Sequence, residues 1–191
     1  MNDKIKEIIE EIEAMKLKLA EEISLQEEHI SYEIKKGYTT FENEVLAKQK
    51  ENMKNLLVWF RDIPLVYLLS APLIYGMIIP VMFLDVILFV YQQVIFRIYK
   101  FEFIKRSDYV IFDHQHLGYL NSIEKLNCMY CSYFNGLMQY ASVIAGRTEL
   151  FFCPIKHAKR IVYEHKYYNK YLFYGDGEEY QKKLKKLRDE Q

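Results

Sequence analysis

The residues best suited to chemistry are the three cysteines of the chain and the histidine that follows the last of them. Cys128 and Cys131 form a Cys-x-x-Cys pair, and Cys153 precedes His157 with Cys-x₃-His spacing. Three thiolates and an imidazole make a closed tetrahedral shell for a borderline-soft ion, and Zn²⁺ is the default candidate. A closed shell leaves no open position for water or substrate. The sequence therefore predicts a structural zinc site.

Other interpretations of these cysteines stay open at the level of sequence. An iron centre is the alternative metal site, a Cys-x-x-Cys dithiol can carry out redox chemistry, and buried thiols can be inert. The βαβ pattern expected around a thioredoxin-like motif is not visible, which disfavours the redox interpretation. The chain begins with charged residues and has an odd number of cysteines. Both features favour a protein in a reducing compartment with free thiols over a protein held together by disulfides.

Helices are predicted to position the four candidate ligands. From Leu117 to about Phe152 the apolar residues recur with a helical period, which puts Cys128 and Cys131 on one helix face. Asn135-Gly136 is a possible interruption of this helix. Because proline suits the first turn of a helix, Pro154 predicts a new helix with Cys153 at its N-terminus and His157 one turn inside. A helix N-terminus favours the thiolate that a metal requires.

Further polar residues near the cysteines have two interpretations each. His114 and His116 can supply alternative ligands, since His-x-His in an extended segment points both rings the same way, or they can belong to a polar loop. Glu149, in the run Arg147-Thr-Glu149, can support a metal ligand or form an ordinary intrahelical charge pair. His29 and His165 are expected to be solvated. No catalytic residue is assigned. A competing function class is a metal- or thiol-dependent enzyme that uses Asp85, His114, His116 or Glu149.

Residues 63–96 form an apolar stretch that contains one charged side chain, Asp85. Its length exceeds the ~18 apolar residues that mark a transmembrane candidate, but it is short for two spans of ~20 residues. Pro80 is the natural break. Three arrangements fit: a single tilted or kinked span, a re-entrant hairpin, or two buried helices of a soluble core. Basic residues flank both ends, which favours a hairpin with both ends in the cytoplasm.

Asp85 requires an account in each of these arrangements, because a carboxylate is costly at bilayer depth. One interpretation is a proton or ligand site. The other is a structural partner for Arg97, for a tyrosine hydroxyl or for a backbone group freed by proline. Gln92 and Gln93 lie about two turns further on and indicate that this helix has a protein-facing side.

Residues 2 to about 60 are charged and helical in pattern. A narrow apolar stripe is predicted to pack on the chain itself or to mediate self-association, and it consists of Ile5, Ile8, Ile12, Met15 and Leu19. Gly37 breaks the pattern. Thr39 and Glu42 then have capping-box spacing, so a second helix is expected from near Phe41 to Trp59 and Phe60. The zone is interpreted as a helical hairpin.

The C-terminal region interleaves tyrosines with basic residues. The aromatic members are Tyr163, Tyr167, Tyr168, Tyr171, Phe173 and Tyr174, and the basic ones are Lys156, Lys159, Arg160, Lys166 and Lys170. This pattern fits an anionic bilayer surface, nucleic acid or ordinary packing. Because the net charge is zero, nothing global favours nucleic acid, and the apolar stretch makes the membrane interpretation more economical. A charged, exposed helix is expected from Glu178 to Arg188.

The chain resembles a family of uncharacterised bacterial membrane-associated proteins. The likeness spans roughly residues 64–160, with its most specific motifs in the runs CMYCSYFNG, RTE and CPIKHA, which begin at Cys128, Arg147 and Cys153. The chain departs from the family pattern at Phe151-Phe152, where Tyr-Trp is expected, and at His114, where arginine is expected. The resemblance implies one integrated unit and no particular reaction.

Together these features predict an all-α protein in three zones. Residues 1–62 form the N-terminal helical hairpin, 63–98 the apolar membrane segment, and 99–191 a helical module with the Cys3His site. The predicted function is a membrane-associated, metal-binding protein with a scaffolding or partner-binding role, and a homo-oligomer or protein partner is expected at the N-terminal helices. We expect it at the inner (cytoplasmic) membrane, with its soluble parts facing the cytoplasm.

Overall fold

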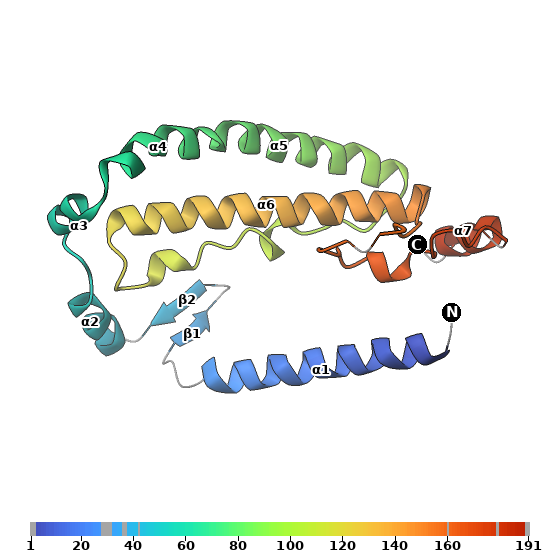
Figure 1. Cartoon of the computed structure of the whole chain (residues 1–191), viewed down its shortest axis with the longest axis horizontal. Helices are drawn as coiled ribbons and strands as arrows, with labels where there is room; N and C mark the ends of the chain where they lie inside the picture. Colours follow the sequence, from blue (N-terminus) through green and yellow to red (C-terminus); the bar gives the residue numbers. More distant parts are fainter. Residues whose placement is uncertain are drawn as a thin grey trace. The chain divides into compact units, whose positions relative to one another are not determined.

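A computed structural model describes residues 3–27, 32–35, 38–41, 43–159, 161–178 and 180–189, and these are mostly helical, as predicted. Figure 1 shows the order of the elements along the chain. The chain forms two compact units. The first comprises Met1–Asn55 and His116–Asn121, and the second comprises Leu56–Gln115 and Ser122–Gln191. The apolar stretch and the C-terminal region, expected as separate zones, thus belong to one unit.

The first unit contains a β-hairpin where the turn of a helical hairpin was expected. Helix α1 (Asp3–Glu27) is followed by strands β1 (Tyr32–Lys35) and β2 (Tyr38–Phe41), which pair antiparallel with Tyr32 opposite Phe41. Aromatic and β-branched residues make up all of β2 and half of β1, and such residues favour extended backbone over helix. The chain is therefore mostly helical rather than all-α. Gly37, Glu42 and His29 lie outside the described residues, and so does the predicted capping box.

The apolar stripe of α1 is exposed. The relative exposures of Ile8, Ile12, Met15 and Leu19 lie between 44% and 61%. Helix α2 (Asn43–Glu51) instead holds the loop formed by residues 116–121: the Gly118 amide donates to Gln49 Oε1 at 2.8 Å. A side chain at Gly118 would begin 3.0 Å from Gln49 Cβ, so the loop needs a residue without Cβ at this point. The second helix expected in this zone is divided, because α2 ends at Glu51 and α3 (Leu56–Asp62) starts the second unit.

The apolar stretch forms one continuous helical rod rather than a hairpin. Helix α4 (Leu65–Gly76), helix α5 (Ile78–Tyr91) and the π-helix η1 (Gln92–Phe96) follow one another in a gently curved line (Figure 1). We call residues 65–96 the apolar rod. Pro80 does not break it, because this residue lies in the first turn of α5, where its missing amide hydrogen is not needed. The rod is long and apolar enough to cross a membrane.

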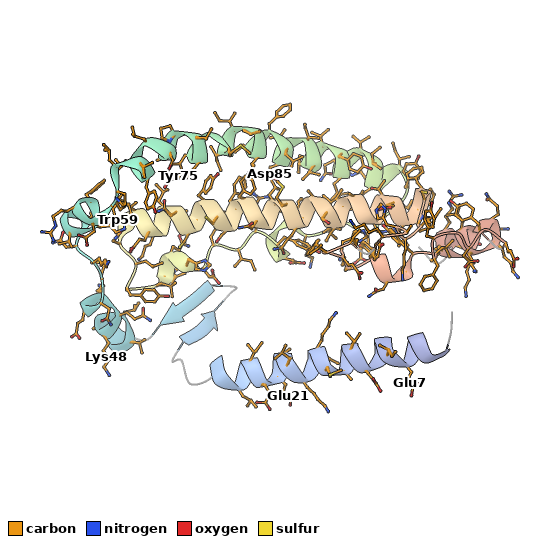
Figure 2. The ribbon with its side chains drawn as sticks, viewed as in Figure 1. Glu7, Glu21, Lys48, Trp59, Tyr75 and Asp85 are labelled. Atoms are coloured by element: carbon orange, nitrogen blue, oxygen red, sulfur yellow. The ribbon has the colours of Figure 1, made fainter. Side chains whose placement is uncertain are left out.

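The rod has two different faces. Its inner face includes Val81, Gln92 and Phe96, which are buried, and Tyr75 and Asp85, which are half-buried. Figure 2 shows Tyr75 and Asp85 on the side that faces helix α6. Only 11% of the most apolar part of the rod is buried, whereas a core helix of a soluble protein is mostly buried. The arrangement as two buried helices of a soluble core therefore does not form.

The rod ends in a backbone motif that turns the chain back. Lys100 has a φ of 57°, the left-handed conformation that terminates many helices. The next amide, that of Phe101, donates to the Phe96 carbonyl at 2.8 Å, and the two rings pack with centroids 5.4 Å apart. This is the hydrogen-bond pattern of a Schellman motif with its accompanying apolar contact. It places residues 97–115, which we call the return segment, against helix α6.

Helix α6 (Ser122–Phe152) runs parallel to the rod. Near its start Tyr130 donates to the Ile74 carbonyl at 2.6 Å, and near its end Thr148 lies 3.0 Å from the Tyr91 hydroxyl. The return segment runs the opposite way along α6. Phe101 packs beneath Arg147, Tyr109 packs on Tyr140, and His114 contacts Ser132. Apart from Arg97 and Ile98, which are helical, and the 3-10 turns η2 (Arg106–Asp108) and η3 (His114–His116), this segment is irregular.

The C-terminal region folds onto the end of α6. Residues 153–178 contain the 3-10 turn η4 (Tyr168–Lys170) and a parallel bridge between Ile155 and Leu172. Helix α7 (Tyr180–Asp189) lies close to the predicted position and is charged, but it is not wholly exposed. Its Leu184 is buried, and its Arg188 donates from Nε to the Phe151 carbonyl at 2.9 Å.

Candidate functional site

The four predicted zinc ligands do not come together within the chain. Cys128 and Cys131 lie near the start of α6, whereas Cys153 follows its last residue. At ~1.5 Å of rise per residue, the helix separates Cys131 from Cys153 by roughly 33 Å. Two sulfurs on one zinc ion lie at most ~4.6 Å apart, since each Zn–S bond is ~2.3 Å long. Within the described ranges, no three His, Cys, Asp or Glu side chains are grouped closely enough to hold a metal ion.

The separation arises because α6 is uninterrupted at Asn135-Gly136. Gly136 is buried and faces the return segment, where a Cβ atom would overlap the Tyr109 carbonyl oxygen and come within 2.9 Å of Val110 Cα. The glycine is therefore explained by the close approach of a second backbone, with no break in the helix. From the sequence the dipeptide was interpreted only as a possible interruption of the helix, because the partner segment lies far away in the chain.

The predicted helix at Pro154 does not form either. Pro154 is fully buried and is the second residue after the end of α6, and residues 153–167 contain no helix within the described part of the chain. The residue before a proline is driven toward extended backbone, so Pro154 ends a helix here and begins none. Cys153 is exposed, and its amide donates to the Glu149 carbonyl at 2.8 Å. His157 is held through its backbone amide, which donates to the Tyr168 hydroxyl at 3.1 Å.

The Cys-x-x-Cys pair instead lies beside His114 and Asp113. These four residues help to line one open pocket of about 450 Å³ between α6 and the return segment. The Nδ1 atom of His114 lies 3.1 Å from Asp113 Oδ1 and 3.3 Å from Ser132 Oγ. A proton on Nδ1 donated to the carboxylate leaves Nε2 with a free lone pair, which is the state of a metal-binding imidazole. The pocket thus gathers sulfur, nitrogen and oxygen donors.

His116 does not join His114 in this pocket. Both lie in the 3-10 turn η3, in which residues two apart point in different directions, so the extended His-x-His geometry considered from the sequence is not formed. His116 also groups with the first unit, whereas His114 belongs to the second. The exposed thiol of Cys131 additionally borders an apolar pocket of about 540 Å³ between α3, α4 and the start of α6.

At the far end of α6, the run Arg147-Thr148-Glu149 joins the helix to three segments. The guanidinium of Arg147 lies 4.1 Å from the centre of the Phe101 ring in the return segment, and burial lowers its pKa. Thr148 meets the Tyr91 hydroxyl of the rod. Glu149 accepts a hydrogen bond from the Tyr171 hydroxyl at 3.1 Å. Successive helical residues point about 100° apart, which explains why three neighbours reach three different partners.

Tyr171 is the centre of this packed end. Its hydroxyl also donates to the Gly146 carbonyl at 2.9 Å and lies 3.3 Å from His165 Nε2. Burial, followed by the nearby charge of Glu149, raises the pKa of Tyr171 well above its ordinary value. His165 was expected to be solvated, but it is half-buried, and burial lowers its pKa. A Cβ atom on Gly146 would overlap the His165 ring, so this glycine admits the imidazole against the helix.

Much of the aromatic and basic run is therefore packing surface. Tyr168 and Tyr171 are buried, and the Nζ atom of Lys156 lies 4.6 Å from the centre of the Phe173 ring. Tyr163 and Tyr174 stay exposed. Arg160 lies outside the described residues.

Asp85 has a structural partner, although it is not Arg97. Arg106 of the return segment donates from Nε and Nη2 to both carboxylate oxygens at 2.8–3.2 Å, and the Tyr133 hydroxyl donates at 2.9 Å. The hydrogen bond with Asp85 raises the pKa of Arg106, and burial raises that of Tyr133. The sequence indicated a tyrosine hydroxyl as one possible partner. It carried no signal for Arg106, because only the Schellman turn brings that residue back to the rod.

Two further contacts of the inner face were not predicted. The Tyr75 hydroxyl donates to the Asn127 side-chain oxygen. Gln92 donates to the Ile104 carbonyl at 3.1 Å and accepts from the Tyr140 hydroxyl at 3.2 Å. The predicted protein-facing side of the rod is thus occupied by α6 and the return segment.

Comparison of the chain with protein-family models, with curated proteins and with solved structures finds no match.

Proposed function

We propose that this protein is membrane-associated and that the outer face of the apolar rod is its lipid-contacting surface. One observation carries the proposal: from Leu68 to Val94, every exposed residue is apolar or glycine. The relative exposures of Leu73, Ile79 and Phe83 reach 80%, 71% and 66%. A continuous apolar surface of this length exceeds what soluble monomers leave in water. The polar side chains of Tyr75, Asp85, Tyr91 and Gln92 turn inward to α6 and the return segment.

Fractionation tests the proposal. The chain should sediment with membranes, stay in the pellet after carbonate washing and need detergent for release. A double variant, Phe83→Glu with Val86→Glu, should move a large part of the protein to the soluble fraction, because charged side chains partition poorly into lipid. Tyr174→Glu, at an exposed site outside the rod, is the matched control and should leave fractionation unchanged. Release of monomeric wild-type protein by salt or carbonate would contradict the proposal.

The expected cytoplasmic location extends this proposal. Thiols kept for metal binding need a reducing compartment, and the chain enters and leaves the rod next to basic residues on both sides. We propose that Cys131 and the N-terminal lysines lie on the same, cytoplasmic side. Impermeant thiol and amine reagents should then label neither group in intact cells and both after lysis. Labelling of one group alone in intact cells would place the two groups on opposite sides.

Metal binding is a second proposed function. Cys128, Cys131, His114 and Asp113 line one pocket, but they are not grouped closely enough there to hold a metal ion, so binding requires their side chains to move together. Two thiolates, an imidazole and a carboxylate form a tetrahedral set that zinc accepts, with iron as the alternative metal. His114 replaces arginine of the resembling family, so this ligand set is a property of the present chain. The Cys153 and His157 pair lies too far along α6 to complete a shell with Cys128 and Cys131 of the same chain.

Elemental analysis of purified variants tests the metal site. His114→Ala and Cys131→Ser should each lower the metal content strongly, while Cys153→Ser and His157→Ala should leave it near one ion per chain. Loss of metal from all four variants would contradict the pocket and would point to a Cys3His shell shared between two chains. If the purified protein contained no metal and its thiols titrated freely, metal binding would be excluded as a function. The interpretation as a thiol-dependent enzyme would then remain.

The N-terminal helix is the proposed site of a protein partner or of self-association. Its apolar stripe is exposed at Ile8, Ile12, Met15 and Leu19. Replacing Ile12 and Met15 with lysine should reduce any oligomer seen by cross-linking in detergent. An unchanged cross-linking pattern would assign the stripe no role in self-association.

A further inference from the structure

We infer that the apolar rod lies in the plane of the membrane surface and that the chain does not cross the bilayer. This inference rests on the proposed membrane association and specifies its geometry. The partner is one leaflet of a lipid bilayer, which the rod enters sideways with its outer face. Three features of the second unit lead to this arrangement: the direction of α6, the composition of the return segment and the length of the rod.

The first feature is that α6 runs parallel to the rod. Tyr130 meets Ile74 at one end, and Thr148 meets Tyr91 at the other. Two parallel neighbours must be joined by a connection that travels back along their full length. The return segment makes this connection, since its contacts on α6 move from Arg147 through Tyr140 to Ser132 as the chain advances from Phe101 to His114. A rod that crossed a bilayer would therefore take this segment across with it.

The second feature is that the return segment cannot occupy hydrocarbon. From Tyr99 onward it is irregular apart from two 3-10 turns, and irregular backbone exposed to lipid leaves amide and carbonyl groups without partners. It also carries exposed charged residues along its length, namely Glu102, Lys105, Arg106, Asp108 and Asp113. Detaching it from the rod would separate Arg106 from Asp85 and Ile104 from Gln92. The folded second unit is thus incompatible with a perpendicular span.

The third feature is length. The rod has 32 residues, which at ~1.5 Å per residue is ~48 Å. A hydrocarbon core of ~30 Å would require a tilt of roughly 50°, beyond the ~0–40° seen for transmembrane helices. An in-plane rod has no such mismatch. Its polar side is supplied by α6 and the return segment, so the second unit as a whole is amphipathic in the manner of an interfacial helix.

The charges and side-chain types of the rod indicate that its outer face contacts lipid and not a second copy of the chain. The exposed residues beyond the two ends of the rod include Arg61, Arg97 and Lys100, which suit anionic headgroups. Tyr67, in the first turn of the rod, is 64% exposed and places a hydroxyl where the interface is polar. Between these ends the exposed residues of the outer face offer no side-chain hydrogen-bonding group. A protein interface usually needs several.

Depth measurement on vesicles tests the inference. Single-tryptophan proteins are made in a Trp59→Phe background, with Leu69→Trp, Phe83→Trp or Val90→Trp, all on exposed apolar positions of the rod. Each is bound to phosphatidylcholine–phosphatidylglycerol vesicles that contain lipids brominated at different acyl depths. An in-plane rod should give equal, shallow depths at all three positions, ~5–10 Å below the headgroups. Tyr174→Trp, exposed in the C-terminal region, is the control and should show no quenching.

The other outcomes overturn the inference in distinguishable ways. If the tryptophan of the Phe83→Trp protein lay near the bilayer centre while those of the other two proteins lay near opposite interfaces, the rod would span the membrane, and membrane association would still stand. Two results would indicate that the outer face of the rod contacts protein and not lipid. In one, the three proteins bind no vesicles. In the other, their tryptophans are shielded from water but not quenched by bromolipids. The proposed lipid contact would then fail as well.

Discussion

The two ends of helix α6 differ in their contacts and in their exposure to solvent. At the end near Phe152, each of the residues Arg147, Thr148 and Glu149 contacts a different segment, and the Tyr171 hydroxyl is surrounded by polar groups in the protein interior. At the end near Ser122, Cys131 is exposed, Cys128 is half-buried, and His114 faces an open pocket. One helix thus has a closed end that holds the unit together and an open end whose reactive groups reach solvent.

The difference shows that residues of one sequence signature need not form one site. The CxxC and CPIKH motifs were predicted to be two halves of a metal shell, yet most of a helix of 31 residues lies between them. The RTE motif is explained by packing at the closed end. The first motif shares an open pocket with His114 and Asp113, so the open end is the place to look for chemistry.

The largest expected effect on stability comes from adding a side-chain atom between α6 and the return segment. Gly136→Ala should destabilise the second unit by about 3 kcal/mol, because the new Cβ meets backbone atoms of Tyr109 and Val110 that cannot rotate away. Gly76→Ala is the matched control. Its Cβ would have nothing within 4 Å, and the change should stabilise by about 0.5 kcal/mol through helix propensity. Denaturant unfolding of detergent-purified protein measures both. Equal effects would mean that the return segment does not lie against α6.

A smaller effect is expected when the closed end loses one hydroxyl. Tyr171→Phe should cost about 2 kcal/mol, since the Gly146 carbonyl and the Glu149 carboxylate each lose a hydrogen-bond donor in a partly buried place. Tyr174→Phe, at a side chain that is 69% exposed, should change stability by less than about 0.5 kcal/mol. The two variants should differ in unfolding midpoint but not in metal content, because the proposed metal pocket lies at the other end of the helix.

The smallest effect concerns pH at the closed end. Burial lowers the folded-state pKa of His165 below the ordinary value of 6.5, while Glu149 and Glu164 act in the opposite direction. The unfolded chain therefore binds the proton first as the pH falls. The stabilisation from neutral His165 should be complete above about pH 6.5 and should decline as the pH drops through about 6.5 toward the folded-state pKa. Comparing unfolding midpoints at about pH 7.5 and about pH 5.5 should show a smaller shift for His165→Gln. An identical shift in both proteins would contradict this assignment.

Sequence patterns predicted the parts of the fold that depend on local periodicity. The helix through Cys128 and Cys131, the long apolar segment and the inward side of Gln92 all follow from residue spacing along one element. Helix α7 also begins close to its predicted start. These features need no knowledge of which element lies next to which.

The features that the sequence missed depend on contacts between distant segments. Asn135-Gly136 fits a turn until Tyr109 is seen to pass beside it, and Pro154 fits a helix start as well as a helix end. Arg97 was one of three candidate partners of Asp85, beside a tyrosine hydroxyl and a backbone group, yet Lys100 reverses the chain and delivers Arg106. The four predicted ligands lie apart because a long helix separates the two motifs, and metal binding itself stays a prediction. The number of residues between the two motifs does not give the distance between them in space.

The parallel pairing of the rod and α6 also sets an order of events during synthesis. Tyr91 and Thr148 are 57 residues apart, so the rod is complete well before its inner-face partner exists. At ~5–20 residues per second, the ribosome needs about 3–11 s to supply it. During this interval Arg106 and Ile104 can already reach Asp85 and Gln92, whereas the tyrosine partners of these two residues, Tyr133 and Tyr140 of α6, do not yet exist. On the proposed membrane surface, a nascent rod would keep its outer face in lipid and its polar side toward water until α6 arrives.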